Sequence, residues 1–354
     1  MKAVTSPTPF HARTAEHNPA NAWLPHGAFT IPAHYGSPDQ EALAARTSVV
    51  MIDVSAQQDL HIVGQGASAL LSTACGPAVR GIAVGHSEDV YWCADGGGLR
   101  GFGVLSRLAD DAFLLRSADA DIGWFADAAP RFGSTQVSEE TAGRGLLLVT
   151  GPYAIALMIA ARLEIASLEA RRHAAFDWRG LPVTVFRGGR LGGYQIACAA
   201  ADASLVFDRL YGAGHLVSLR LAGESALQLL YLEAGMPIPH LDFTPAREPF
   251  ARAPSPLALG FSHPQDAGAG NGGAVLAGLE LDSDEPLPFA PVISGSGEVG
   301  RTLRSLYSPS LKSAIALAEI SPKCASPGTT LTVRQVDATG RRDIAARVVA
   351  LPFL

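Results

Sequence analysis

The closing part of the chain reads Gly297-Glu298-Val299-Gly300-Arg301, Tyr307-Ser308-Pro309-Ser310-Leu311-Lys312, Ile315-Ala316-Leu317-Ala318-Glu319-Ile320, Pro327-Gly328-Thr329-Thr330-Leu331-Thr332-Val333 and Ala345-Ala346-Arg347-Val348-Val349-Ala350-Leu351-Pro352-Phe353. Short apolar runs alternate with turns rich in Gly, Pro and Ser, which is typical of consecutive strands. We therefore expect a small β-barrel or jelly roll over residues 289–354.

The composition is that of a folded protein with a substantial core. The chain has 354 residues, of which 48% are hydrophobic and 17% are charged, and its formal net charge is −6. This length predicts two or three structural units. The sequence contains no basic tract, so we expect a small-molecule substrate and no nucleic acid as partner. The oligomeric state is left open.

The four cysteines, Cys75, Cys93, Cys198 and Cys324, lie far apart and do not have the spacing of a zinc or redox motif. We therefore expect a reducing compartment and no metal site. The N-terminus has no sustained apolar run, and no apolar stretch is long enough to span a bilayer. These features favour a cytoplasmic protein that makes no membrane contact.

The part of the chain before the barrel predicts two α+β units. Ser37 can cap a helix with Pro38 at its first position, and the apolar strand Val49–Val54 follows. Alternating strands and helices continue to Ala129, and the alternation starts again at Gly145. The expected divisions are a flexible or wrapping N-terminal arm at 1–25, a first lobe at 26–50 with 141–260, a second lobe at 51–140, a linker at 261–288 and the barrel at 289–354.

Five short motifs occur in order along the chain. They are Asp53-Val54-Ser55, Gly64-Gln65-Gly66-Ala67, Asp95-Gly96-Gly97-Gly98-Leu99, Leu232-Glu233-Ala234-Gly235 followed by Asp242 and Thr244-Pro245, and the C-terminal Ser-Pro-x-Leu and Leu-Pro-Phe. Together they resemble the glycine-cleavage T-protein (aminomethyltransferase) family over residues 34–353. The resemblance implies an α+β fold in which three domains form a ring. It also implies that tetrahydrofolate enters the central opening and receives a one-carbon unit.

Several positions depart from the family pattern. The family's catalytic aspartate after the Gly-Gly turn matches Arg100 or Gly101, and its pterin-binding glutamate is missing around Gly189–Tyr194. Tyr231 stands where the family has arginine, and Ser117 where it has asparagine. A guanidinium repels a developing cation but suits an anionic partner. The family's demethylases also depart from the glycine-cleavage pattern, so the loss of the aspartate is compatible with demethylation and argues against the glycine-cleavage reaction itself.

The candidate catalytic residues are Arg100, Tyr194, Tyr91 and Asp95. Arg100 would hold an anionic group, and Tyr194 or Tyr91 would act as a general acid. Asp95 would replace the missing carboxylate from the other side of the turn. The alternatives are a surface arginine, a tyrosine packed in the core, and an aspartate that stabilises its own turn.

The candidate cofactor-binding residues share positions that the resemblance places near folate. They are Glu233, Arg187, Ser117, Tyr35 and Tyr231. Arg187 with Tyr194 could hold a planar anion or form an exposed hairpin pair, and Glu233 could contact the pterin or accept a backbone N–H.

The resulting hypothesis is a tetrahydrofolate-dependent one-carbon transferase or demethylase that transfers a methyl group from a small, anionic substrate. One alternative is a folate-independent lyase, hydratase or isomerase that acts on a small acid in the same cavity. The other is a folate-binding protein without catalysis.

Overall fold

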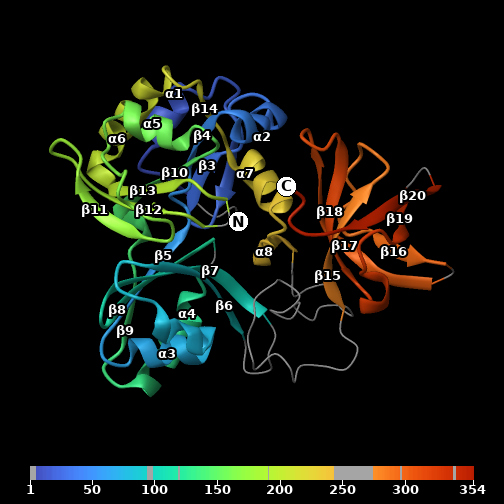
Figure 1. The fold of residues 1–354 in the computed structure, drawn as a ribbon, viewed down its shortest axis with the longest axis horizontal. Coiled ribbons are helices and arrows are strands. Elements are labelled where there is room, and N and C mark those ends of the chain that lie inside the picture. The colour runs from blue at the N-terminus through green and yellow to red at the C-terminus, as the bar shows by residue number, and fades with distance from the viewer. Residues whose placement is uncertain are drawn as a thin grey trace. The chain divides into compact units, whose positions relative to one another are not determined.

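The structure is a computed structural model that describes residues 5–93, 99–118, 120–189, 191–242, 274–295, 297–337 and 340–354 (Figure 1). Two compact units share the chain. Unit 1 comprises Met1–Val90 and Gly101–Leu227, and unit 2 comprises Tyr91–Arg100 and Gln228–Leu354. Asp95 and residues 243–273 lie outside the described residues.

A six-stranded sheet forms the first lobe of unit 1. Its order is β11-β12-β13-β10-β4-β14, and all neighbours are antiparallel except β4 and β14, which are parallel. The strands are β4 (Val49–Asp53), β10 (Arg144–Thr150), β11 (His173–Asp177), β12 (Pro182–Arg187), β13 (Tyr194–Ala199) and β14 (Leu219–Leu221). Every residue of β4 is buried, which explains why the sequence is apolar from Val49 to Ile52.

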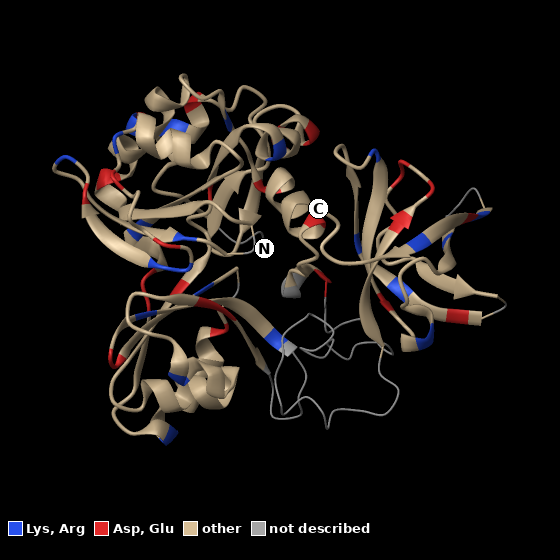
Figure 2. Ribbon diagram, in the orientation of Figure 1, with Lys and Arg blue, Asp and Glu red and all other residues tan. Residues whose placement is uncertain are grey.

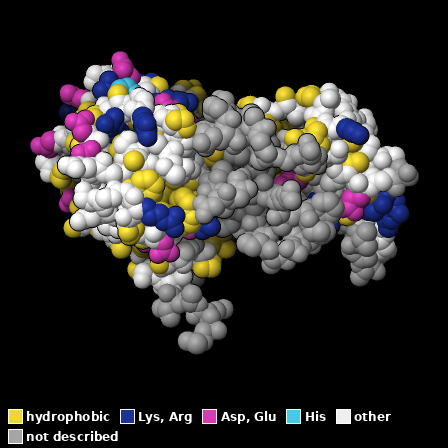
Figure 3. Space-filling view, turned by 90° about the horizontal axis from the view of Figure 1, so that it is seen from below, with side chains coloured by type: hydrophobic (Ala, Val, Ile, Leu, Met, Phe, Trp, Pro, Cys, Tyr) yellow, Lys and Arg dark blue, Asp and Glu magenta, His cyan; other side chains and the backbone are white. Residues whose placement is uncertain are grey.

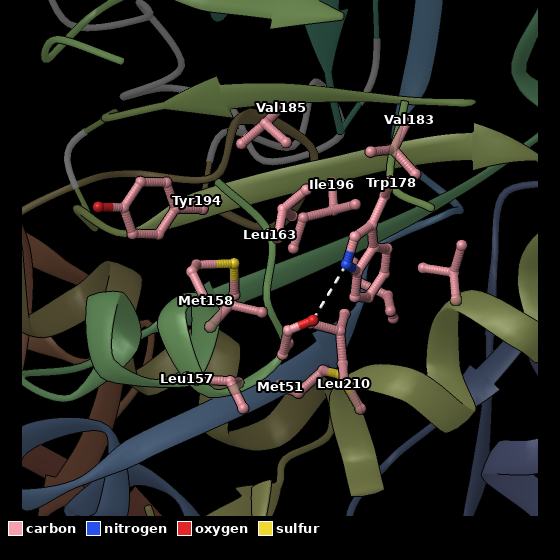
Figure 4. Packing of buried hydrophobic residues seen from close by; sticks show 14 of the residues in the cluster. Met51, Leu157, Met158, Leu163, Trp178, Val183, Val185, Tyr194, Ile196 and Leu210 are labelled. Carbon is pink, nitrogen blue, oxygen red and sulfur yellow. Dashed lines mark hydrogen bonds between the residues drawn. The ribbon is translucent and has the colours of Figure 1, made fainter. Parts of the chain in front are cut away.

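Helices α1 (His11–Glu16), α2 (Pro38–Thr47), α5 (Ala154–Ala160) and α6 (Ala203–Gly214) belong to this lobe (Figure 1). Helix α2 begins as predicted, with Ser37 Oγ accepting the N–H of Gln40. The core includes Trp178, whose Nε1 donates to the carbonyl oxygen of Ala161 at 3.0 Å (Figure 4). The large indole is therefore buried without leaving its N–H unpaired.

The N-terminal segment is folded into this lobe. Strands β1 (Ser6–Pro7), β2 (Trp23–His26) and β3 (Phe29–Pro32) form a small sheet in the order β1-β3-β2. Phe10 is fully buried in the lobe's core, and a Cβ added to Gly145 would lie 2.7 Å from its ring. A single aromatic anchor in a polar stretch has no periodicity, so the sequence pattern did not reveal it.

A five-stranded sheet forms the second lobe, with the order β6-β7-β8-β5-β9. Its strands are β5 (Gln58–Val63), β6 (Ser87–Cys93), β7 (Leu99–Ala109), β8 (Ala112–Ser117) and β9 (Gln136–Glu139), and its helices are α3 (Ala67–Cys75) and α4 (Ile122–Ala128). Gly66 precedes α3, and a Cβ there would lie 1.6 Å from the carbonyl oxygen of Phe132. Only glycine allows this close packing of the turn.

Short 3-10 turns connect several of these elements. They are η1 (Pro77–Gly81), η2 (Ala129–Phe132), η3 (Thr141–Gly143) and η4 (Ala200–Asp202) in unit 1 and η7 (Pro322–Cys324) in unit 2. No helix in the described ranges is long and apolar enough to cross a membrane.

Unit 2 contains a closed barrel with the order β15-β18-β17-β16-β19-β20. Its strands are β15 (Val275–Leu281), β16 (Pro291–Ser294), β17 (Gly297–Ser308), β18 (Ser313–Ile320), β19 (Thr330–Asp337) and β20 (Gly340–Val349). The barrel expected at 289–354 thus also uses β15, which falls in the range expected as a linker. The Gly- and Pro-rich composition around this apolar strand obscured it.

The C-terminus is attached to the end of α7 (Glu224–Glu233) within unit 2, where α8 (Pro239–Asp242) follows. The N–H groups of Phe353 and Leu354 donate to the carbonyl oxygen of Glu233 at 2.8 and 3.2 Å. The Glu233 carboxylate accepts the Ser308 hydroxyl at 2.7 Å. Glu233 is fully buried and therefore connects the helix, a barrel strand and the chain end.

A buried ion-pair cluster joins the two sheets of unit 1. Arg116 on β8 donates from Nε and Nη2 to the two carboxylate oxygens of Asp59 on β5, both at 2.7 Å. Arg144 on β10 donates to the same carboxylate at 2.6 Å, and Arg116 Nη1 donates to Gln195 on β13 at 3.0 Å. Burial alone raises the pKa of Asp59, but attraction to Arg116 and Arg144 outweighs it and lowers the pKa to about 2.

A second polar contact between the sheets involves His173. Its Nδ1 lies 3.3 Å from Ser87 Oγ, which lies 2.7 Å from Ser106 Oγ. The imidazole also stacks on Phe186 with ring centroids 5.2 Å apart. Burial lowers the pKa of His173, and the positive charges of Arg116, His86 and Arg172 lower it further. The neutral imidazole is therefore the form that the fold favours.

Replacing Asp59 with asparagine should destabilise the protein by about 3–5 kcal/mol, because two buried guanidinium groups would lose their anion. Urea unfolding followed by circular dichroism measures this. Asp110→Asn is the matched control: Asp110 is exposed and lies 3.8 Å from Arg107, so its loss should change stability by less than about 1 kcal/mol. Equal effects of the two substitutions would contradict the importance of the cluster.

The stabilising contribution of neutral His173 should be present at pH 8 and decline as the pH falls below the ordinary histidine pKa of about 6.5. The unfolded chain binds the proton more readily than the folded one in this window, so protonation favours unfolding. His173→Gln should remove this decline and flatten the unfolding free energy between pH 8 and 5. An unchanged pH profile would show that another group is responsible; Ser87→Ala, which keeps the imidazole, is the control.

Candidate functional site

Three candidate residues of unit 1 lie at strand ends: Ser117 on β8, Arg187 on β12 and Tyr194 on β13. Arg116 lies over the Phe186 ring, 4.4 Å from its centroid. The next residue, Ser117, is buried and donates its hydroxyl to the carbonyl oxygen of Phe102 at 2.7 Å. A guanidinium on an aromatic face is held by both the ring and its hydrogen bonds. Arg116 is therefore a fixed positive charge beside the predicted Ser117.

Arg187 and Tyr194 face each other across the β12–β13 hairpin. They are paired in register, and the guanidinium carbon lies 5.8 Å from the centroid of the tyrosine ring. Arg187 is half-buried and donates from Nη1 to the carbonyl oxygen of Leu168. Tyr194 is 4% exposed, and its hydroxyl points away from the labelled core side chains (Figure 4). The pair is thus partly enclosed rather than an exposed hairpin pair.

The turn between these strands requires glycine. Gly192 and Gly193 have φ values of 67° and 76°, and a Cβ on Gly193 would lie 2.2 Å from the carbonyl oxygen of Val149. A residue with a side chain would be strained and would collide with β10. The glycines of this turn therefore have a structural role in holding Arg187 against Tyr194.

Tyr35 lies in a groove of about 260 Å³ on unit 1. Beside it, the buried carboxylate of Glu41 accepts the backbone N–H groups of Tyr35 at 2.7 Å, Gly36 at 3.1 Å and Gly223 at 2.9 Å. Burial raises the pKa of Tyr35 well above its ordinary value, and the negative charges of Asp53 and Glu41 raise it further. The phenol therefore keeps its proton at physiological pH.

The remaining candidates belong to unit 2. Tyr91 on β6 is buried, and Arg100 on β7 is exposed. Tyr231 on α7 is half-buried, whereas Glu233 is fully buried and accepts the Ser308 hydroxyl. The structural reading of Glu233, as an acceptor inside the fold, is supported by this contact.

The buried carboxylates with described donors hold groups of the chain itself. Asp53 accepts the Thr8 hydroxyl at 2.6 Å and the N–H of Ser55 at 3.0 Å. Asp59, Glu41 and Glu233 are likewise hydrogen-bonded within the protein. Among the described residues, no three His, Cys, Asp or Glu side chains converge as metal ligands.

Asp59, Arg116 and Arg144 were not among the predicted site residues. Each is a charged residue in a strand that also carries buried apolar residues, and such residues need a partner when they are buried. That signal could have identified all three as buried, but not as partners of one another, because they come from three strands far apart in sequence.

Charged side chains are distributed over both units. Lys and Arg are interspersed with Asp and Glu along the described ribbon (Figure 2). On the face of unit 1 drawn in Figure 3, hydrophobic side chains lie in groups between charged ones. This mixed surface has the character expected from the composition.

Comparison with known proteins gives two domain matches. Residues 10–253 match the GCVT N-terminal domain, and residues 275–354 match the glycine cleavage T-protein C-terminal barrel domain. The crystal structure of glycine cleavage system aminomethyltransferase T from Bartonella henselae aligns with a TM-score of 0.81 at 22% identity, covering 99% of this chain and 98% of that one. The expected α+β fold with a C-terminal barrel is confirmed.

Two relatives of known name illustrate the range of similar proteins. An aminomethyltransferase from Streptomyces avermitilis is 27% identical over 344 residues and covers 91% of each chain. A trimethylamine-oxide aldolase from Ruegeria pomeroyi is 26% identical over 375 aligned residues, covering 96% of this chain and 46% of that protein. Since the two domain matches together span nearly all of its length, the chain belongs to the glycine-cleavage T-protein (aminomethyltransferase) family.

Proposed function

We propose that the protein transfers a methyl group from a small, anionic, methylated substrate to tetrahydrofolate. The observation that carries this proposal is family membership over both the N-terminal domain and the barrel. The name of the Ruegeria pomeroyi relative refers to trimethylamine oxide, which carries methyl groups on nitrogen. This supports a methylated small molecule as the substrate class.

The chemical groups of folate can be compared with the side chains that this chain offers. Its glutamate tail carries carboxylates, which guanidinium groups bind well. Arg187 uses Nη1 for Leu168, and no other hydrogen bond of its guanidinium joins it to a described residue. Arg187 therefore fits a carboxylate, whereas Tyr194 is 4% exposed and its role as a stacking face stays a prediction. Tetrahydrofolate, when bound, would supply the nitrogen that accepts the one-carbon unit.

The roles assigned to the other residues follow their chemistry. Arg100, exposed on β7, would bind the anionic group of the substrate. The hydroxyl of Tyr194, or that of Tyr91, would give a proton to the departing oxygen, sulfur or nitrogen. Asp95 lies outside the described residues, and its role as a replacement carboxylate stays a prediction.

The folate-independent alternative has one observation in its favour. The pterin ring offers several N–H donors, and a carboxylate is their natural acceptor. Asp53, Asp59, Glu41 and Glu233 are all buried and already accept hydrogen bonds from the chain. A lyase, hydratase or isomerase acting on a small acid would need no such acceptor.

Tetrahydrofolate should bind the full chain, and Arg187→Met should weaken binding roughly 10- to 100-fold, because charge-assisted hydrogen bonds contribute about 1.5–3 kcal/mol. Anaerobic titration calorimetry measures both constants. Arg131→Met, at an exposed arginine of η2, is the control and should bind like the wild type.

Two results of that titration would count against the proposal. Absence of binding at millimolar tetrahydrofolate would favour the folate-independent alternative. Equal binding by wild type and Arg187→Met would retain folate but remove Arg187 from its site.

A further inference from the structure

The groove that contains Tyr35 belongs entirely to unit 1. It lies where α2, α6 and β14 come together with the end of α1. Its lining includes His17, Tyr35, Glu41, Tyr211, Leu219 and Arg220. The volume of about 260 Å³ is just below the roughly 300–1,000 Å³ of sites for drug-sized ligands, so it suits a ligand with a single ring.

One wall of the groove is aromatic and held in place by the core. The His17 and Tyr211 rings lie 4.3 Å apart between centroids, and both pack against Phe207 at 5.9 and 5.6 Å. Phe207 is 1% exposed and belongs to the main core of the lobe. The wall is therefore positioned before any ligand arrives, which reduces the entropy lost on binding.

The groove is lined by one carboxylate, Glu41, and one guanidinium, Arg220. Glu41 accepts three backbone N–H groups, so its carboxylate is already well satisfied. Arg220 is exposed, and no hydrogen bond or ion pair joins its side chain to another described residue. Nearby Arg13 differs, because it is bound to Asp208 at 2.7 Å and to Glu16 at 3.0 Å. Arg220 therefore presents N–H donors at this groove that no described residue accepts.

We propose that this groove is a further binding site, which takes a small planar carboxylate. The ring of the ligand packs against His17, Tyr35 and Tyr211, and its carboxylate pairs with the Arg220 guanidinium. This site is independent of the folate chemistry proposed above and assigns Tyr35 to a different ligand.

Benzoate is the probe for this site, because it has one ring and one carboxylate. Titration calorimetry at pH 7 should show binding to the wild-type chain, weakened roughly tenfold or more by Arg220→Met. Tyr211→Leu should also weaken it, because the aromatic face is lost while apolar volume is kept. Arg80→Met, at an exposed arginine of η1, is the control and should leave benzoate binding unchanged.

The charge preference is tested with benzyltrimethylammonium, a cation with the same ring, because aromatic walls can also bind cations. Benzoate should bind more tightly. Stronger binding of the cation, no binding of benzoate, or equal benzoate affinity in wild type and Arg220→Met would each overturn the proposal. Circular dichroism and thermal unfolding of the variants establish that they are folded.

The same variant separates this proposal from the folate hypothesis. Arg220→Met should bind tetrahydrofolate like the wild type. If the wild type binds benzoate but not folate, the proposal of the groove as a binding site is retained and the proposed function fails. If it binds folate but not benzoate, the groove proposal fails and the folate hypothesis is retained.

Discussion

The carboxylate of Asp59 is the contact on which the architecture of unit 1 depends. It receives two guanidinium groups, from Arg116 and Arg144, and so connects β5 and β8 of one sheet to β10 of the other. Because all three groups are largely buried, removing the carboxylate would leave positive charge without compensation. Through Gln195 and Phe186, the same cluster fixes the strands that carry the candidate residues Arg187 and Tyr194.

Local sequence patterns predicted those helices and strands whose ends are set by capping residues and turns. The cap at Ser37 marked the start of α2, and the closing alternation of turns and apolar runs marked the barrel. The buried role of Phe10 and the strand β15 were not evident, because each depends on distant partners. The Asp59 cluster was missed for the same reason: periodicity shows which face of a strand is buried, but not which charges meet inside.

The candidate site was only partly predictable from the sequence. Arg187 and Tyr194 were expected together, and the structure pairs them across one hairpin. The groove beside Tyr35 was not expected, because His17, Tyr211 and Arg220 come from separate elements and form no motif. For Glu233 the sequence allowed either a ligand contact or a structural acceptor, and its carboxylate accepts the Ser308 hydroxyl.

Guanidinium groups occur among the candidate residues at Arg100 and Arg187, whereas the carboxylates of Asp53 and Glu233 accept hydrogen bonds from the chain itself. The proposed anionic substrate rests on this contrast. The most direct test is incubation of the protein with tetrahydrofolate and ¹³C-methyl-labelled N- or O-methylated carboxylic acids, followed by ¹³C NMR. The account predicts that label moves onto folate at a rate that depends on the protein. Conversion of such an acid without transfer of label to folate would contradict it.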